Sequence, residues 1–160
     1  MSNVAVITGA AQGIGRRTAQ VLNEQGWSLL LLDLQPIDAS EYASALAITG
    51  DISDEQFVES AATQCLAKFG RVDALVNNAG IQYVEPTVGV SIERMQRLLD
   101  VNLTSPLTLM QLVMPDMIAR KSGTIVNVAS VAAITHTPGM CHYNGSKAGL
   151  AACSESLRVE

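Results

Sequence analysis

Short, uninterrupted runs of apolar residues alternate along the chain with longer stretches in which apolar residues recur every three or four positions. The runs predict strands at residues 4–8, 29–32, 45–49, 74–76 and 124–128. Strands that are apolar on both faces are typical of a parallel sheet covered by helices on both sides. The alternation of strands and helices therefore predicts an α/β fold with a doubly wound parallel sheet in three layers.

Polar residues and glycines mark the expected ends of the helices. Ser53 is the predicted N-cap of the helix after the third strand, with Gln56 in the capping-box position. Gly70 is expected to end that helix, and Gly26 to end the first helix, because glycine readily adopts the left-handed conformation found after a helix.

The last two helical patterns have unusual features. Pro115 lies inside the pattern at about residues 107–121, where we expect a kink. The pattern at 143–160 has no C-cap, no terminal glycine and no strand after it. We therefore expect a single domain over residues 1–160 that ends inside a helix and is incomplete on its C-terminal side.

Composition excludes several classes of protein. Ten basic and fifteen acidic side chains give a net charge of -5 without a basic cluster, which argues against nucleic-acid binding. The apolar runs are too short to cross a membrane, and no secretory signal precedes the first strand, so we expect a cytoplasmic protein. An odd number of cysteines without CxxC spacing predicts reduced thiols at Cys65, Cys141 and Cys153.

The segment TGAAQGIG, at residues 8–15, lies between the first strand and the first helix. Glycine there lets the backbone approach a pyrophosphate, which the free N–H groups of the helix N-terminus attract. The predicted cofactor-binding residues are Gly9, Gln12, Gly13, Ile14 and Gly15. The alternative is a tight turn that needs glycine for steric reasons alone.

Two aspartates at strand ends extend this prediction. Asp33 ends the second strand, where a carboxylate can accept hydrogen bonds from the adenosine ribose and disfavour a 2′-phosphate, so NAD is expected rather than NADP. Arg16 and Arg17 are a contrary hint, with exposed helix residues as the simpler interpretation. Asp51 and the adjacent Ile52 are also predicted cofactor-binding residues. Asp51 either binds the adenine amino group or helps to cap the helix at Ser53.

The spacing TGxxxGxG resembles that of the short-chain dehydrogenase/reductase family, which has a Rossmann-type fold. Further motifs match in the same order: NNAG at 77–80, Asn102 in DVNLTSP, Ser130 at the end of VNVAS, and Tyr143 and Lys147 in a YxxxK pattern. Gly145 departs slightly from the small residue usual in the family and leaves the two reactive side chains unchanged. The resemblance covers nearly the whole chain.

The physical chemistry of the YxxxK pair can be considered independently of the family. Residues four apart share one face of a helix, so Tyr143 and Lys147 can converge on one point. A free tyrosine has a pKa of about 10 and is a poor base at neutral pH, but a nearby ammonium stabilises a phenolate. The pair could therefore exchange a proton with an alcohol or a ketone.

The resemblance implies roles for the remaining motif residues. Ser130 would bind the substrate oxygen, Asn102 would hold a water of a proton relay, and Tyr143 and Lys147 would also contact the cofactor. Asn78, Ala79 and Gly80 would meet its adenosine side. Three of the motif residues also have a simpler interpretation: Ser130 as a strand cap, Asn102 as a partner of local backbone, and Lys147 as a solvated charge.

A cluster near the YxxxK motif allows other chemistry. His136, Cys141 and His142 could suggest a metal site or a Cys–His nucleophile, but a third ligand in a convincing frame is missing, so no metal is predicted. We expect these residues to line the substrate side of the pocket with Tyr83 and Met140.

The sequence thus predicts an NAD-dependent oxidoreductase acting on a secondary alcohol or ketone. The alternative is a non-catalytic nucleotide-binding domain or an inactive fragment of such an enzyme, and we expect these 160 residues alone to be inactive. Family members commonly form homodimers or homotetramers, which implies self-association through the helices at 103–121 and 143–160. Loops 81–91 and 131–142 do not identify the substrate.

Overall fold

The computed structural model describes residues 2–159 and is built around one sheet of five parallel strands. The strands are β1 (Val4–Thr8), β2 (Ser28–Asp33), β3 (Ala45–Thr49), β4 (Ala74–Asn77) and β5 (Thr124–Asn127), in the spatial order β3-β2-β1-β4-β5. Register is continuous from Val4 beside Ser28 to Thr8 beside Leu32. The predicted Rossmann-type, doubly wound sheet is confirmed, with strand ends within one residue of those expected.

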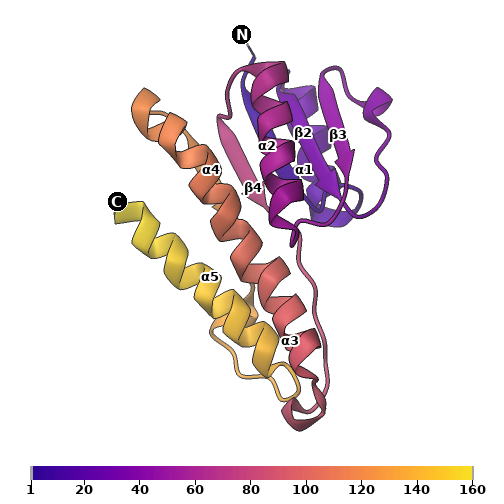
Figure 1. The fold of residues 1–160 in the computed structure, drawn as a ribbon, viewed down its shortest axis with the longest axis vertical. Coiled ribbons are helices and arrows are strands. Elements are labelled where there is room, and N and C mark those ends of the chain that lie inside the picture. Colours follow the sequence, from indigo (N-terminus) through magenta and orange to yellow (C-terminus); the bar gives the residue numbers. More distant parts are fainter. Residues whose placement is uncertain (1, 160) are drawn as a thin grey trace.

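Helices cover both faces of the sheet and make three layers (Figure 1). The helix α1 (Gly13–Glu24) packs on one face, and α2 (Glu55–Phe69) and α4 (Ser105–Arg120) pack on the other. The short helix α3 (Ile92–Leu99) leads through the π-helical turn η3 (Asp100–Thr104) into α4, and the last helix is α5 (Cys141–Val159). Single 3-10 turns form η1 (Ala39–Glu41), η2 (Thr87–Gly89) and η4 (Val131–Ala133).

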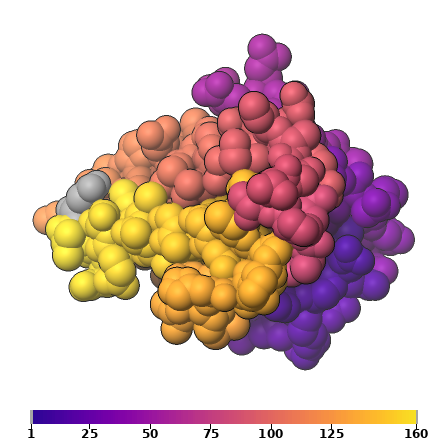
Figure 2. Space-filling view, turned by 90° about the horizontal axis from the view of Figure 1, so that it is seen from below, coloured from indigo at the N-terminus to yellow at the C-terminus, as the bar shows by residue number. Residues whose placement is uncertain are grey.

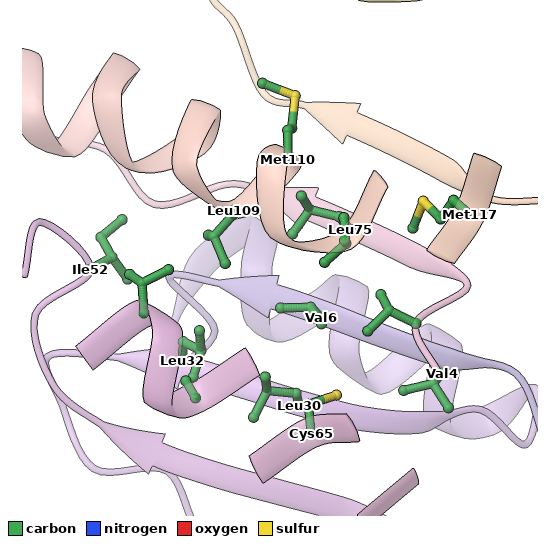
Figure 3. Close-up of a cluster of buried hydrophobic side chains, with 14 of the residues drawn as sticks. Val4, Val6, Leu30, Leu32, Ile52, Cys65, Leu75, Leu109, Met110 and Met117 are labelled. Atoms are coloured by element: carbon green, nitrogen blue, oxygen red, sulfur yellow. The ribbon is translucent and has the colours of Figure 1, made fainter. Parts of the chain in front are cut away.

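The core consists of two apolar clusters, one on each face of the sheet. The larger joins alternate residues of β1 and β2, such as Val6 and Leu30, to Cys65 of α2 and Leu109 of α4 (Figure 3). Residues in between, such as Ile7, face the other way onto α1. Each fully buried leucine stabilises the fold by about 1.5–3 kcal/mol. Because both faces are covered, the strands are apolar throughout and not alternating.

The predicted C-terminal end of α2 agrees with the structure, and its predicted N-cap does not. Gly70 ends α2 with a left-handed φ of 79°, as predicted. The N-cap, however, is Asp54, whose carboxylate accepts hydrogen bonds from the backbone N–H groups of Gln56 and Phe57. The prediction of Ser53 as the cap is wrong because its hydroxyl instead donates to the carboxylate of Asp51, at 2.8 Å.

Two other predicted features lie in the C-terminal half. The helix α4 continues through Pro115 from Ser105 to Arg120, and the kink expected there stays a prediction. The last helix begins at Cys141, two residues before the predicted start, and its predicted end at Glu160 lies outside the described residues.

The strand β5 forms one edge of the described sheet, and β3 forms the other. Among residues 2–159, β5 pairs only with β4, and Val126 is 46% exposed. Beyond this edge a hollow of about 890 Å³ lies between α4 and α5, lined by Met110, Met114, Met117, Ile118, Lys121, Ser122, Gly123, Ile125, Asn127, Ser154, Glu155, Leu157 and Arg158. An unpaired, partly apolar strand edge is prone to aggregation. Within the described chain no helix combines the length and apolar character needed to span a membrane.

A buried ion cluster joins the N-terminal end of β1 to α4. The carboxylate of Asp73 accepts hydrogen bonds from the backbone N–H of Val4 at 3.0 Å and from the guanidinium groups of Arg71 and Arg120. Burial by itself would raise the pKa of Asp73, but these hydrogen bonds and charges outweigh it and hold the pKa below its ordinary value. The carboxylate therefore stabilises the fold only while it is ionised.

We predict that Asp73→Asn lowers the free energy of unfolding at neutral pH by about 2 kcal/mol, less than the loss of a fully buried pair because both arginines keep part of their solvation. The folded-state pKa is depressed, so the stabilisation is present above the unfolded pKa of about 3.9 and is lost as the pH falls through the lower folded value. Urea denaturation across pH measures both effects.

Asp116→Asn is the control for this prediction, since it removes only an exposed i,i+4 partner of Arg120 and should cost less than about 0.5 kcal/mol. An equal loss in the two variants, or a difference from the unchanged protein that persists at acid pH, would contradict the assigned role of Asp73.

Candidate active site

A cavity of about 320 Å³ lies at the carboxyl ends of β1, β2, β3 and β4. This is where the strand order reverses, the usual ligand site of an open α/β sheet. Eight of the predicted cofactor residues line it: Gly9, Gln12, Asp33, Asp51, Ile52, Asn78, Ala79 and Gly80. The cavity is also lined by residues that no sequence motif indicated: Leu34, Gln35, Gly50, Ile81, Arg97 and Val101.

The glycine loop is packed tightly against the loop that follows β4. The Asn78 side-chain amide donates to the backbone oxygens of Thr8 and Gly9, at 3.0 and 3.1 Å. The buried Thr8 hydroxyl accepts from the backbone N–H groups of Asn78 and Ala79, both at 3.0 Å. Thr8 is thus a central residue of the site that sequence analysis missed, because its partners are 70 residues away.

The first turn of α1 comes directly after this loop. Gly13, Ile14 and Gly15 form that turn, and Gln12 occupies the N-cap position without a side-chain cap. They stand beside the cavity and not in its lining, except for Gln12. Uncapped N–H groups and the positive end of the helix dipole suit a phosphate group.

The two predicted aspartates are held by protein donors. One oxygen of Asp33 accepts from the backbone N–H of Ala11 and the other from that of Gln35, each at 2.9 Å. Asp51 binds Ser53 at the start of α2 and forms an ion pair with Arg97 at 2.6 Å. The helix-start role of Asp51, one of the two alternatives, is therefore present in the structure, although Asp54 makes the cap itself.

The carboxylate of Asp51 stays ionised through these partners. Burial would raise its pKa, but the hydrogen bond from Arg97 and those from Ser53 hold the pKa below the ordinary value. Arg16 and Arg17 contribute no charge to the cavity, since they pair with Glu41 and Glu24 on the exposed surface.

Lys147 is the most deeply buried cation of the site. Its side chain is 4% exposed, and its ammonium donates to the backbone oxygen of Val128 at 2.8 Å and lies 6.0 Å from the centre of the Tyr143 ring. Burial lowers the pKa of Lys147 from its ordinary value. Lys147 is therefore not the solvated charge of the simpler interpretation.

Gly80 brings the cavity and Lys147 together. A Cβ atom at this position would lie 3.3 Å from Oδ1 of Asn102 and 3.5 Å from Nζ of Lys147. Asn102 is fully buried in the π-helical turn η3, and such turns are often found at functional sites. Its amide binds both the N–H and the C=O of Ile81, at 2.8 Å each, as the backbone-partner alternative expected.

Ser130 lies at the start of η4, which packs against α5. Its hydroxyl oxygen accepts a hydrogen bond from the backbone N–H of Ala132 at 3.1 Å. This bond uses a lone pair, so the hydroxyl hydrogen can still be donated. Ser130 caps the turn and retains its ability to bind an oxygen of a substrate.

Loops 81–91 and 131–142 meet on one side of the start of α5. The backbone N–H of Glu85 donates to Gly139 at 2.9 Å, and Figure 2 shows the orange segment before α5 against the pink segment before α3. Arg94 binds Glu85 and lies over the ring of Tyr83 at 4.3 Å. Met140 contacts Gln82, which places part of the predicted substrate side in this region.

The predicted His136, Cys141 and His142 do not form a cluster that could hold a metal. Within residues 2–159 no three His, Cys, Asp or Glu side chains come together in that way. His136 and Cys141 are exposed, and Nε2 of His142 is buried without a hydrogen-bond partner in the structure. The three cysteines are free thiols, and burial raises the pKa of Cys65 to about 11.

The sequence of this chain matches a known protein family. The family described as short chain dehydrogenase matches residues 3–160. The chain belongs to the short-chain dehydrogenase family. One relative, the short chain dehydrogenase adrF of Penicillium rubens, is 36% identical over 157 residues, which are 96% of this chain and 62% of the relative. The chain therefore spans less than two thirds of the length of this relative.

Solved structures in the family have the same fold. A metagenomic short-chain oxidoreductase in complex with NADP is 32% identical, with a TM-score of 0.87 over 98% of this chain and 76% of its own. 4-Hydroxyisoleucine dehydrogenase complexed with NADH is 26% identical, with a TM-score of 0.91 over 99% of this chain and 69% of its own. Relatives of this fold thus bind either cofactor.

Gly15 is tightly packed at the start of α1. A Cβ atom at residue 15 would lie 2.1 Å from the backbone oxygen of Gly9 and 2.6 Å from Nδ2 of Asn78. We predict that Gly15→Ala lowers the free energy of unfolding by about 3 kcal/mol or more, because backbone atoms cannot move aside. Chemical denaturation followed by circular dichroism measures the loss.

Gly145→Ala is the matched control, because Gly145 also lies in a helix but has open space around its Cα atom. Alanine should stabilise that helix by about 0.5–1 kcal/mol. A Gly15→Ala protein as stable as the unchanged chain would show that the loop is not packed as described.

Proposed function

We propose that this protein transfers hydride between a nicotinamide cofactor and a secondary alcohol or ketone, with Tyr143 as the general acid and base. The observation that carries the proposal is the buried ammonium of Lys147, held at Val128, close to both the Tyr143 ring and Gly80 of the cavity. A buried cation is costly unless it is paired. The neighbouring phenol of Tyr143 indicates that this cation takes part in proton transfer.

The residues of the cavity fit such a cofactor. Gly9 and Gly15 leave room for close backbone approach, the first turn of α1 offers N–H groups, and Asp33 lines the cavity. These groups would hold the pyrophosphate and the adenosine ribose. When bound, the cofactor supplies or accepts the hydride.

The protein's own residues would then move the proton. In reduction, the Tyr143 hydroxyl gives its proton to the carbonyl oxygen; in oxidation, the phenolate takes the proton of the alcohol. The ammonium of Lys147, 6.0 Å from the centre of the Tyr143 ring, supplies a positive charge next to the phenol that would exchange the proton. Ser130 donates its free hydroxyl hydrogen to the same substrate oxygen as negative charge develops there. The fully buried Asn102 keeps the loop at Ile81 in place beside them.

We further propose that NAD is preferred to NADP. Asp33 places a carboxylate in the cavity, and the nearby cations Arg16 and Arg17 are paired elsewhere. A carboxylate attracts ribose hydroxyl groups and repels a 2′-phosphate.

A second candidate is nucleotide binding without turnover. The cavity is lined by the residues proposed to bind the adenosine end of the cofactor, but by none of Ser130, Tyr143 and Lys147. The chain also spans 62% of the length of the Penicillium relative. Fluorescence titration with NADH, together with nicotinamide absorbance during incubation with alcohols and ketones, separates the two. Binding with turnover supports the enzyme; binding without turnover supports the nucleotide-binding domain.

We predict that Tyr143→Phe lowers the rate of hydride transfer by about 10²–10⁴-fold, because the ring stays and only the proton-transferring group is lost. The Kd for NADH should change less than about twofold, since Tyr143 is absent from the cavity lining. Nicotinamide absorbance follows the rate and fluorescence follows binding.

Tyr42→Phe is the control, because Tyr42 lies in the apolar cluster on the α1 face of the sheet and does not line the cavity; it should leave the rate unchanged. A Tyr143→Phe protein that turns over at the full rate would remove Tyr143 from the mechanism.

We predict that Asp33→Ala reduces the preference for NADH over NADPH by about 10–100-fold, as expected for the loss of charge-assisted hydrogen bonds and of repulsion. Isothermal titration with each cofactor measures the ratio. Asp38→Ala removes the same charge from the segment that follows β2, where Asp38 binds Ser40 away from the cavity, and should leave the ratio unchanged. Equal ratios in Asp33→Ala and the unchanged protein would refute the assignment.

A further inference from the structure

Ser146, between Tyr143 and Lys147 on α5, is fully buried and polar, at 0% exposure. Its hydroxyl donates to the backbone oxygen of Tyr143 at 2.8 Å and accepts from Nδ2 of Asn102 at 3.1 Å. A hydroxyl has one hydrogen, so donation to Tyr143 leaves only lone pairs facing Asn102. The serine thus requires a donor at that point and receives it from the asparagine amide.

Asn102 is oriented by this requirement. Its Oδ1 accepts from the N–H of Ile81 at 2.8 Å, and its Nδ2 donates to the C=O of Ile81 at 2.8 Å and to Ser146. A rotated amide would place its oxygen against two acceptors and its NH₂ group against a donor. Both hydrogens of Nδ2 are used, so this amide has no further donor for a water molecule.

These bonds join the cavity to the helix that carries the proposed proton donor. Ile81 lines the cavity, Asn102 lies in η3, and Ser146 and Tyr143 lie in the first turns of α5. All four bonds are buried or partly buried, where exchange with water is restricted and an unpaired polar group is costly. The separation of 44 residues between Asn102 and Ser146 makes this a tertiary link.

We propose that Ser146 is a positioning residue that sets the place of Tyr143 relative to the cofactor cavity by fixing the Asn102 amide. The proposal rests on the proposed function for its kinetic consequence. Its structural consequence, a coupling between the side chain of residue 146 and the backbone of Ile81, stands without it. Ser146 does not itself contact the reacting atoms.

The chain contains a matched control two turns further along the same helix. The Ser154 hydroxyl donates to the backbone oxygen of Leu150 at 2.7 Å and accepts from Nδ2 of Asn127 at 2.8 Å. The local hydrogen bonds of Ser154 are therefore like those of Ser146. Asn127 belongs to β5 and does not line the cavity.

The first experiment measures amide hydrogen exchange of Ile81 by NMR in the unchanged chain, Ser146→Ala and Ser154→Ala. We expect exchange at Ile81 to become at least about tenfold faster in Ser146→Ala and to stay within about twofold in Ser154→Ala. Unchanged exchange in Ser146→Ala, or the same acceleration in both variants, would overturn the proposal. This readout does not depend on turnover.

The second experiment measures kcat and the Kd for NADH in the same proteins. Ser146→Ala should lower kcat by at least about tenfold and leave the Kd within about twofold of that of the unchanged chain. Ser154→Ala should keep the kcat of the unchanged chain, once its own loss of stability is taken into account. Equal kcat in the two variants would overturn the positioning role. An unchanged chain without turnover would contradict the proposed function alone, and the exchange result would still decide the coupling.

Ser146→Cys covers the case in which alanine prevents folding. A thiol keeps nearly the same volume but is a weak donor and a weak acceptor. Exchange at Ile81 and kcat should then change in the same directions, with smaller factors. A folded Ser146→Cys protein indistinguishable from the unchanged chain in both measurements would refute the proposal.

Discussion

The glycine loop and the loop after β4 hold each other in place, and the shape of the cavity follows from their contact. Thr8 and Asn78 exchange four hydrogen bonds with each other's loops across the β1–β4 boundary. The close approach leaves no room for a Cβ atom at Gly9 or Gly15. Because the two loops cannot separate without leaving buried polar groups unpaired, the floor of the cavity has one defined shape.

A second set of buried polar contacts connects the loop after β4 to α5. The loop continues through Gly80 to Ile81, which Asn102 binds, and Asn102 in turn binds Ser146. Only one large apolar side chain of α5, Leu150, is fully buried. The first turns of α5 therefore depend more on directional hydrogen bonds than on apolar packing. Such hydrogen bonds fix the position of the helix more than they add to its stability.

Several residues assigned to chemistry also hold the fold together. Asn102 pairs with backbone, Asp51 organises the start of α2 and Ser130 caps η4. For Asp51 and Ser130 the functional and structural interpretations, posed as alternatives from sequence, are therefore compatible. In Ser130 this follows from the hydroxyl group itself, since it can accept one bond from the protein and donate another to a ligand.

Local sequence pattern was enough to predict the five strands, the glycine turn and the YxxxK pair, because apolar runs, glycine and i,i+4 spacing act between neighbours in the chain. Local pattern misplaced the cap at Ser53, whose hydroxyl is taken by Asp51. Only the tertiary structure brought Thr8 to Asn78, Arg97 to Asp51, and Ser146 to Asn102. These partners are separated by 70, 46 and 44 residues, and a hydrogen bond acts only over about 3 Å. Folding alone decides which distant groups come that close.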